Sequence, residues 1–236
     1  MIPEREDDVE TPGRRATVVL VVEDHLLVAH GVAAGLRERG FIVHVAADLE
    51  HDAVVDAARE TQPDIVLLDL VLGDDRGTSI ALIGPLCATG ARVIMVTGVT
   101  DLTLLGACVE AGASGVVDKG APLDHLVEQL AAAADGRTPL PASTRALMLD
   151  ALRRARVDER QRSAPFDALT RREREVLAAL CDGYSAGHIA DASFVSLTTV
   201  RTQIRSIFRK LGVSSQRAAI AAAHRAGWEH AERAPG

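Results

Sequence analysis

Short apolar runs alternate with helix-patterned segments over the first 135 residues, and this alternation constrains the fold more than any other feature of the sequence. Gly40, Gly90 and Gly112 fall where helix ends are expected. Strands that are separated by helices pair in parallel, with helices on both faces of the sheet, so the pattern predicts a doubly wound α/β domain. The expected strands are 18–22, 41–45, 64–69, 92–97 and 114–118, and the expected helices are 25–39, 48–61, 78–88, 101–112 and 122–134.

Charge divides the chain into two unlike parts. Residues 1–135 carry 9 Lys and Arg against 23 Asp and Glu, whereas residues 136–236 carry 17 against 10. An acidic part followed by a basic part favours two functions, with the second part facing nucleic acid.

The three cysteines, Cys87, Cys108 and Cys181, are far apart in the sequence and have no close Cys or His partners. This spacing argues against a zinc site and a disulfide framework, and it is typical of a reducing cytoplasm. The apolar run 18–22 is too short to span a bilayer, and no stretch resembles a signal peptide. We therefore expect a soluble cytoplasmic protein without a membrane partner.

Polar side chains follow several of the expected strands. Glu23 and Asp24 come after the first strand, and Asp69 ends the third. In open α/β sheets ligand chemistry gathers at this edge, and crowded carboxylates there suit a hard Mg²⁺ ion. Thr97 adds a hydroxyl and Lys119 an ammonium. Together these groups predict a phosphoryl-transfer site in which Asp69 is the acceptor.

Residues 16–135 resemble the receiver domain of response regulators, the phosphorylated half of bacterial two-component systems. The resemblance rests on "VVEDH" at 21–25 and on "DLVLGDDRG" at 69–77, which is similar to the family pattern D-x-x-M-P-x-x-x-G. Thr97 and Lys119 fall on the family's Thr/Ser and Lys positions, where they would bind the phosphoryl group and switch the domain.

This resemblance implies a flavodoxin-like (βα)5 fold with strand order 2-1-3-4-5. It also implies that Asp69 takes a phosphoryl group from a sensor histidine kinase and later loses it to water. Any catalysis would thus be limited to the phosphorylation and dephosphorylation of Asp69 itself. The implied Mg²⁺ ligands are Glu23, Asp24, Asp69 and the main-chain carbonyl of Val71.

The sequence departs from the family pattern around the acceptor. Leu72 and Gly73 stand where Met-Pro is usual, which removes a rigid turn. Val116 stands where an aromatic switch residue is usual, which weakens the expectation of an aromatic flip. Val71 and Val99 place apolar side chains beside the site, so neither can orient an attacking water. We therefore expect slow dephosphorylation.

After residue 165 the pattern becomes purely helical and predicts a small all-α domain of four helices with a helix-turn-helix. Thr170 and Glu173 form a capping box before the first helix, and Ser185 and Ser196 cap the second and third. At about 100° per residue the third helix has one apolar side. Its other side has no acid and suits the major groove, with Thr198, Arg201, Thr202, Arg205 and Arg209.

Residues 167–222 resemble the LuxR-type DNA-binding domain. The resemblance rests on "LTRREREVL", "GYS", "IA" and "VSLTTVRTQIRSIFRKLGV". It implies base contacts from Arg201, Thr202 and Arg205, and phosphate contacts from Thr199, Arg209 and Lys210.

The two resemblances together point to a response regulator of the NarL/FixJ type. They imply a transcription regulator in which phosphorylation of Asp69 alters the receiver conformation and licenses promoter binding, with a homodimer as the active form. The expected parts are a disordered acidic N-terminus at 1–15, a receiver at 16–135, a linker with a basic helix at 136–165, a DNA-binding domain at 166–230 and a tail at 231–236.

Two other functions fit parts of the same sequence. One is a DNA-binding regulator whose atypical receiver is switched by a ligand or a partner instead of phosphorylation. The other is a phosphatase with an aspartyl-phosphate intermediate, which would need a second acid two residues after Asp69, where Val71 stands. Labelling of Asp69 by a small phosphoryl donor distinguishes the first from the leading hypothesis.

Overall fold

The computed structural model of the 236-residue chain describes residues 15–73 and 77–228. The chain divides into two compact units between Leu152 and Arg153, inside the predicted linker. Apart from Arg15, the predicted disordered N-terminus lies outside the described residues, as does the predicted C-terminal tail. None of the helices in the described ranges is long and apolar enough to cross a bilayer.

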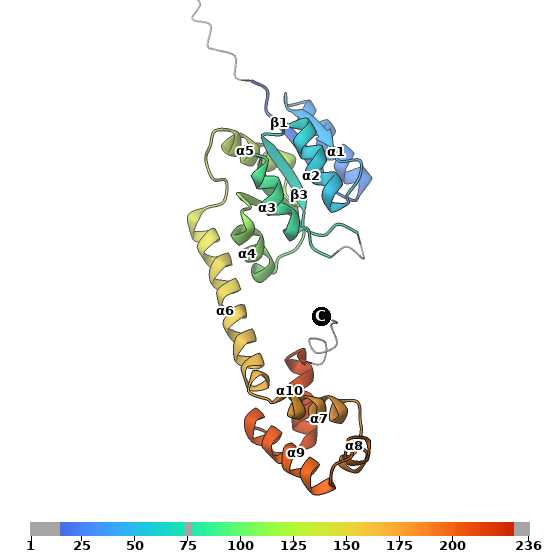
Figure 1. Ribbon diagram of the computed structural model, residues 1–236. Helices are drawn as coiled ribbons and strands as arrows, with labels where there is room; N and C mark the ends of the chain where they lie inside the picture. The colour runs from blue at the N-terminus through green and yellow to red at the C-terminus, as the bar shows by residue number, and fades with distance from the viewer. Residues whose placement is uncertain (1–14, 74–76, 229–236) are drawn as a thin grey trace, which may run out of the picture. The chain divides into compact units, whose positions relative to one another are not determined.

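The first unit contains a five-stranded parallel sheet with the order β2-β1-β3-β4-β5 (Figure 1). This confirms the predicted strand order and the flavodoxin-like fold. The strands are β1 (Val18–Val22), β2 (Ile42–Val45), β3 (Ile65–Asp69), β4 (Arg92–Thr97) and β5 (Gly115–Asp118), and the helices between and after them are α1 (Leu26–Arg37), α2 (His51–Thr61), α3 (Ile80–Ala88), α4 (Leu102–Ala111) and α5 (Leu123–Ala134).

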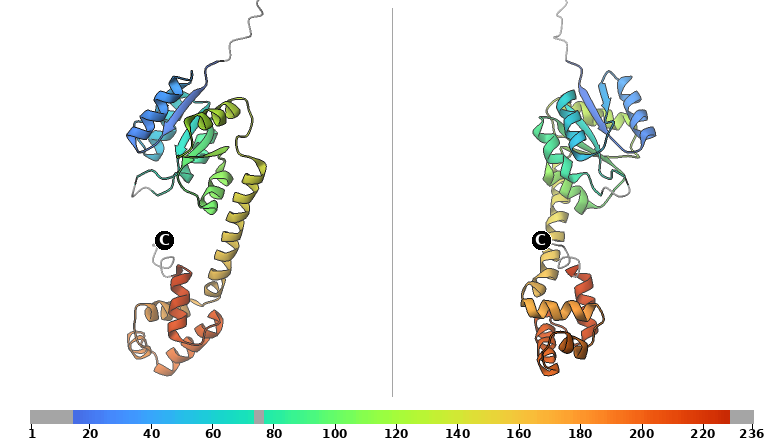
Figure 2. Two further views of the ribbon diagram at one scale, coloured as in Figure 1. Left: turned by 180° about the vertical axis from the view of Figure 1, so that it is seen from behind. Right: turned by 45° about the vertical axis from the view of Figure 1, so that its right-hand side comes forward.

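The sheet has a hydrophobic core on each face. Every residue of β1 and β3 is buried, as expected for strands in the middle of a parallel sheet. Because side chains alternate along a strand, Val19 and Val21 pack on the side of α1 and α5, whereas Leu20 and Val22 pack on the side of α2, α3 and α4. The two views in Figure 2 show helices on both faces. This double cover explains why the strands read as continuous apolar runs.

The predicted helix and strand ends differ slightly from the observed ones. The helix predicted at 48–61 begins only at His51, because the Asp48 carboxylate accepts the main-chain N–H of Glu50 at 2.9 Å and holds a turn there. The basic helix expected within the linker is longer than predicted. It forms α6 (Ala142–Asp167), a helix of 26 residues that includes Pro165.

The second unit contains the four predicted helices and its own core. All three predicted helix caps are present: Thr170 and Glu173 make both bonds of the capping box, and the hydroxyls of Ser185 and Ser196 accept main-chain N–H groups. Trp228 stacks on Phe166 with ring centroids 5.8 Å apart. The helices are α7 (Arg171–Cys181), α8 (Ala186–Ala192), α9 (Leu197–Leu211) and α10 (Gln216–Arg225).

A buried ion pair joins the start of α7 to the end of α9. The Glu173 carboxylate accepts hydrogen bonds from Lys210 Nζ at 2.6 Å and from the main-chain N–H of Thr170 at 2.8 Å. Burial raises the pKa of Glu173, but the hydrogen bonds from Lys210, Ser206 and Thr170 outweigh it and lower the pKa from 4.5 to about 2. The charged form of Glu173 therefore stabilises the packing of α9 against α7.

We predict that Glu173→Ala lowers the free energy of unfolding of the second unit by about 1–3 kcal/mol, because it removes a cap and leaves Lys210 without its buried partner. Trp228 is the single tryptophan of the chain, so its fluorescence during denaturation reports this unit. The control Glu175→Ala removes an exposed pair with Arg172 and should change the value by less than about 0.5 kcal/mol.

The same variant tests the pKa of Glu173. A carboxyl group whose pKa is lower in the folded state stabilises the protein above its unfolded pKa, and this stabilisation is lost as the pH falls toward the folded pKa. The stability difference between wild type and Glu173→Ala should therefore shrink as the pH falls from 4.5 to about 2. A difference that stays constant over this window contradicts the assigned bonding of Glu173.

Candidate functional site

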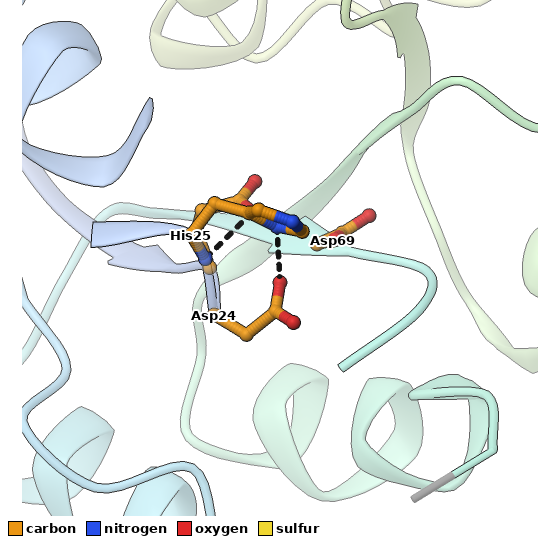
Figure 3. Close-up of side chains that lie close together, drawn as sticks. Asp24, His25 and Asp69 are labelled. Carbon is orange, nitrogen blue, oxygen red and sulfur yellow. Dashed lines mark hydrogen bonds and ion pairs between the residues drawn. The ribbon is translucent and has the colours of Figure 1, made fainter. Parts of the chain in front are cut away.

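The predicted acidic residues meet at the carboxyl edge of the sheet. β1 and β3 are neighbours, with Val22 paired to Leu68, so the residues that follow Val22 lie beside Asp69. Glu23 and Asp69 are buried, with 6% and 4% of their surface exposed. Figure 3 shows Asp69 close to Asp24 and His25. Buried carboxylates are costly unless they are paired, so this edge requires positive charge.

Lys119 supplies that charge. Its Nζ lies 2.8 Å from Asp69 Oδ2 and 2.7 Å from Glu23 Oε2. The main-chain N–H of Lys119 donates to the Thr97 carbonyl at 3.1 Å, which ties the end of β5 to the end of β4. Burial lowers the pKa of Lys119, but hydrogen bonds and charge attraction from Asp69 and Glu23 outweigh this and raise it. Lys119 is therefore a firmly protonated bridge between two carboxylates.

His25 also belongs to this cluster, although the sequence did not predict it as a site residue. Its Nδ1 lies 2.8 Å from Asp24 Oδ1 and 3.1 Å from Glu23 Oε1. Hydrogen bonds with Glu23 and Asp24 raise the pKa of His25. The signal in the sequence is its position directly after Asp24. That position places His25 near the site but does not tell which way its imidazole ring points.

Gly73 has a role that its place in the family pattern did not reveal. Its φ of 70° lies in the left-handed region, and its N–H donates to Asp24 Oδ2 at 2.9 Å. Proline has neither this φ nor an N–H, so the usual residue could not make this bond. Burial raises the pKa of Asp24, but the bonds from Gly73 and His25 outweigh it and lower the pKa. The departure from Met-Pro thus replaces a rigid turn with a hydrogen bond to Asp24.

Thr97 and Ser79 complete the surroundings of Asp69. Thr97 is buried at the end of β4, and its Oγ1 accepts the main-chain N–H of Val99 at 3.1 Å. The Ser79 hydroxyl donates to the main-chain carbonyl of Asp69, which steadies the main chain at Asp69. Val71 is half-exposed and forms an isolated antiparallel β-bridge with Thr78.

The side chains present fit a hard divalent cation. One ligand atom from each of Glu23, Asp24, His25 and Asp69 lies within 4.8 Å of the others. The cluster holds three carboxylates, and the ammonium of Lys119 pairs with two of them, Glu23 and Asp69, which leaves excess negative charge. Carboxylate oxygens are the ligands that Mg²⁺ prefers. Glu23, Asp24 and Asp69 would hold the ion, and a contribution from the Val71 carbonyl stays a prediction.

The second candidate site lies on α9. Six of the seven predicted contact residues are exposed, whereas Val200 and Ile207 of the same helix are buried in the core. Lys210 differs, because its ammonium is held by Glu173. The exposed hydroxyl of Thr202 donates to the carbonyl of Thr198 at 2.9 Å. The six exposed residues are Thr198, Thr199, Arg201, Thr202, Arg205 and Arg209.

Comparison with known proteins matches a family to each of the two units. Residues 19–131 match the response regulator receiver domain, and residues 167–223 match the luxR family of bacterial regulatory proteins. The nitrate/nitrite response regulator protein homolog of Haemophilus influenzae is 33% identical over 204 residues, which cover 85% of this chain and 93% of that protein. The transcriptional regulatory protein LiaR of Bacillus subtilis is 29% identical over 209 residues, which cover 88% of this chain and 96% of that protein.

The fold, the acidic pocket and these matches define a response regulator, and the chain belongs to that family. Within the family it combines a receiver domain with a LuxR-type DNA-binding domain, as the transcription regulators of the NarL, LiaR and DegU type do. A solved structure of an RcsB–DNA complex overlaps 88% of this chain and 97% of that chain, with a TM-score of 0.48 at 23% identity.

We predict that Asp24→Asn weakens Mg²⁺ binding at least about tenfold, because it removes one of three carboxylates from the pocket. Isothermal titration of the full chain with MgCl₂ measures the affinity. The control Glu60→Gln removes an equal charge at the exposed end of α2. This end of α2 leads into the start of β3, at the edge of the sheet opposite the acidic residues, so the control should bind Mg²⁺ as wild type does. Equal affinities for Asp24→Asn and wild type contradict the proposed ligand set.

Proposed function

We propose that this protein is a cytoplasmic transcription regulator that is switched by phosphorylation of Asp69, with a sensor histidine kinase as the phosphoryl donor. The observation that carries this proposal is the placement of the Lys119 ammonium 2.8 Å from a nearly buried Asp69 carboxylate. An aspartate that is only structural needs no excess of negative charge around it, whereas a phosphoryl acceptor needs a cation to offset both its own charge and that of the donor.

The bonding of Asp69 indicates which oxygen reacts. Lys119 holds Oδ2, which leaves Oδ1 as the nucleophile. Oδ1 attacks the phosphorus of the phosphohistidine, an O–P bond forms, the N–P bond breaks, and the electron pair stays on the imidazole nitrogen of the donor. Bound Mg²⁺ supplies positive charge to the phosphoryl oxygens. Lys119 remains protonated and pairs with the charge that the phosphoryl group brings.

Thr97 links this chemistry to the rest of the receiver. In the described state its Oγ1 accepts from the Val99 N–H, and its own hydroxyl hydrogen can donate to a phosphoryl oxygen. Phosphorylation adds charge and acceptor oxygens, so the Thr97 hydroxyl reorients toward the phosphoryl group and Lys119 pairs with it. We infer that the resulting shift favours a homodimer that binds two half-sites of promoter DNA through α9.

A second candidate mechanism retains DNA binding but replaces phosphorylation with a ligand or a partner. The observations that favour it are Val116 in place of an aromatic residue and the Gly73 hydrogen bond to Asp24 in place of a proline turn. Both proposals share the DNA-binding role and differ only in what switches the receiver.

We predict that phosphoramidate and Mg²⁺ add one phosphoryl group per wild-type chain, measured by intact mass, and that Asp69→Asn adds none. Val71 and Val99 cannot orient water, so the phosphorylated form should last minutes or longer. Absence of labelling in the wild type favours a ligand or partner switch. A half-life of seconds overturns the expected slow dephosphorylation.

We predict that Arg205→Ala weakens binding to a DNA site selected by the full chain by about 1–3 kcal/mol, which is about 5- to 150-fold. Arg205 is exposed on α9, where a guanidinium can reach a guanine edge. The control Arg59→Ala removes an exposed arginine of α2, which pairs with Asp56, and should leave the affinity unchanged. Fluorescence anisotropy at fixed salt measures both. Equal losses for the two variants contradict a specific role of α9.

A further inference from the structure

The first part of α6 is built into the core of the receiver unit. Leu140 and Met148 are buried in the same core cluster as Leu105 and Val109 of α4, and Leu149 packs against this cluster. These residues follow the predicted receiver boundary at residue 135, so the receiver core extends into the predicted linker.

The segment between α5 and α6 passes the edge strand β5. The Arg92 guanidinium donates to the Arg137 carbonyl at 3.3 Å. The Pro139 Cβ lies 3.4 Å from the position that a Cβ on Gly115 would take. The chain thus leaves the α5 side of the sheet, crosses the edge at β5 and reaches the α4 side, where α6 begins.

Gly106 is the point at which the main chains of α4 and α6 touch. A Cβ on Gly106 would lie 2.3 Å from the Met148 carbonyl oxygen and 3.0 Å from the Leu152 Cβ. The nearest atom belongs to the main chain, so no side-chain rotation could relieve the contact. Gly84 of α3 offers a comparison: apart from its chain neighbours and the nearby main chain of α3, no atom of the described residues lies within 4 Å of the position of its Cβ.

α4 is tied to the phosphorylation site through its first turn. Only residues 98–100 separate Thr97 from Asp101, whose carboxylate caps α4 by accepting the Thr103 N–H at 2.7 Å. Within this short loop the Val99 N–H donates to Thr97 Oγ1. Val99 and Val116 both pack against the core cluster that contains Met148. A movement of the Thr97 hydroxyl therefore changes a bond in the loop that leads into α4.

We propose that Gly106 is the positioning residue that couples α4 to α6. Its contact with the Met148 carbonyl transmits a movement of α4 to α6. Because protein interiors are close-packed, a shift of α4 at a main-chain contact must also shift α6. This route needs no rotating aromatic residue. It is therefore compatible with Val116, which stands where the aromatic switch residue is usual. α6 extends to Asp167, and Phe166 near its end belongs to the core of the second unit. The inference rests on the proposed function.

The test compares Gly106→Ala with Gly84→Ala, which makes the same change in a helix without crowding. Two quantities are measured on the full chain: labelling of Asp69 by phosphoramidate, and the ratio of DNA affinities with and without phosphorylation. Gly106→Ala should label as wild type does, while its ratio falls by about 2- to 30-fold toward one. Gly84→Ala should keep both values. Hydrogen exchange of residues 146–152 should increase only in Gly106→Ala.

A second variant keeps the test decisive if Gly106→Ala does not fold. Leu152→Ala shortens the side chain of α6 that lies beside Gly106 and adds no atom. It weakens the packing of α6 on α4 and should lower the ratio of DNA affinities in the same way. A wild-type ratio in a folded Gly106→Ala, or in Leu152→Ala, overturns the inference. A wild-type chain that takes no label overturns the proposed phosphorylation instead, so the two failures are distinguishable.

Discussion

The bridge that Lys119 forms between Asp69 and Glu23 is the interaction on which the receiver depends. Two nearly buried carboxylates at one sheet edge would repel each other, and the ammonium between them makes their burial possible. The sheet order creates this geometry, because β1 and β3 are adjacent and β5 delivers Lys119 to the same edge. Residual negative charge then makes the pocket suitable for a divalent ion and a phosphoryl group.

The two units use a lysine and a buried carboxylate for different purposes. Glu173 receives bonds from Lys210, Ser206 and Thr170, and this saturation makes it a structural element that holds α9. Asp69 keeps one oxygen bonded to Lys119 and lies in a cluster with excess negative charge. The bonds that Glu173 receives already stabilise its charge, whereas the charge around Asp69 would be offset further by a bound cation.

Much of this architecture could be predicted from sequence, for identifiable reasons. Apolar runs of strand length predict a parallel sheet, and the parallel pairing predicts that Glu23, Asp24 and Asp69 lie at one edge of it. The contacts of Gly73 and Gly106 could not be predicted, because a glycine in a sequence shows permitted freedom and not the partner that uses it. The LuxR-type resemblance implied a phosphate contact from Lys210, but its flexible side chain pairs with Glu173, a contact that a sequence motif does not report.

The central claim is that charge at Asp69 controls DNA binding by α9. The most direct test is the affinity of the full chain for a selected DNA site, measured at one salt and Mg²⁺ concentration before and after phosphorylation, with Asp69→Asn treated identically. The account predicts that phosphorylation tightens binding at least about tenfold, a coupling of about 1.4 kcal/mol, and that Asp69→Asn shows no change. Equal affinities for the two wild-type states, with labelling confirmed by mass, would contradict it.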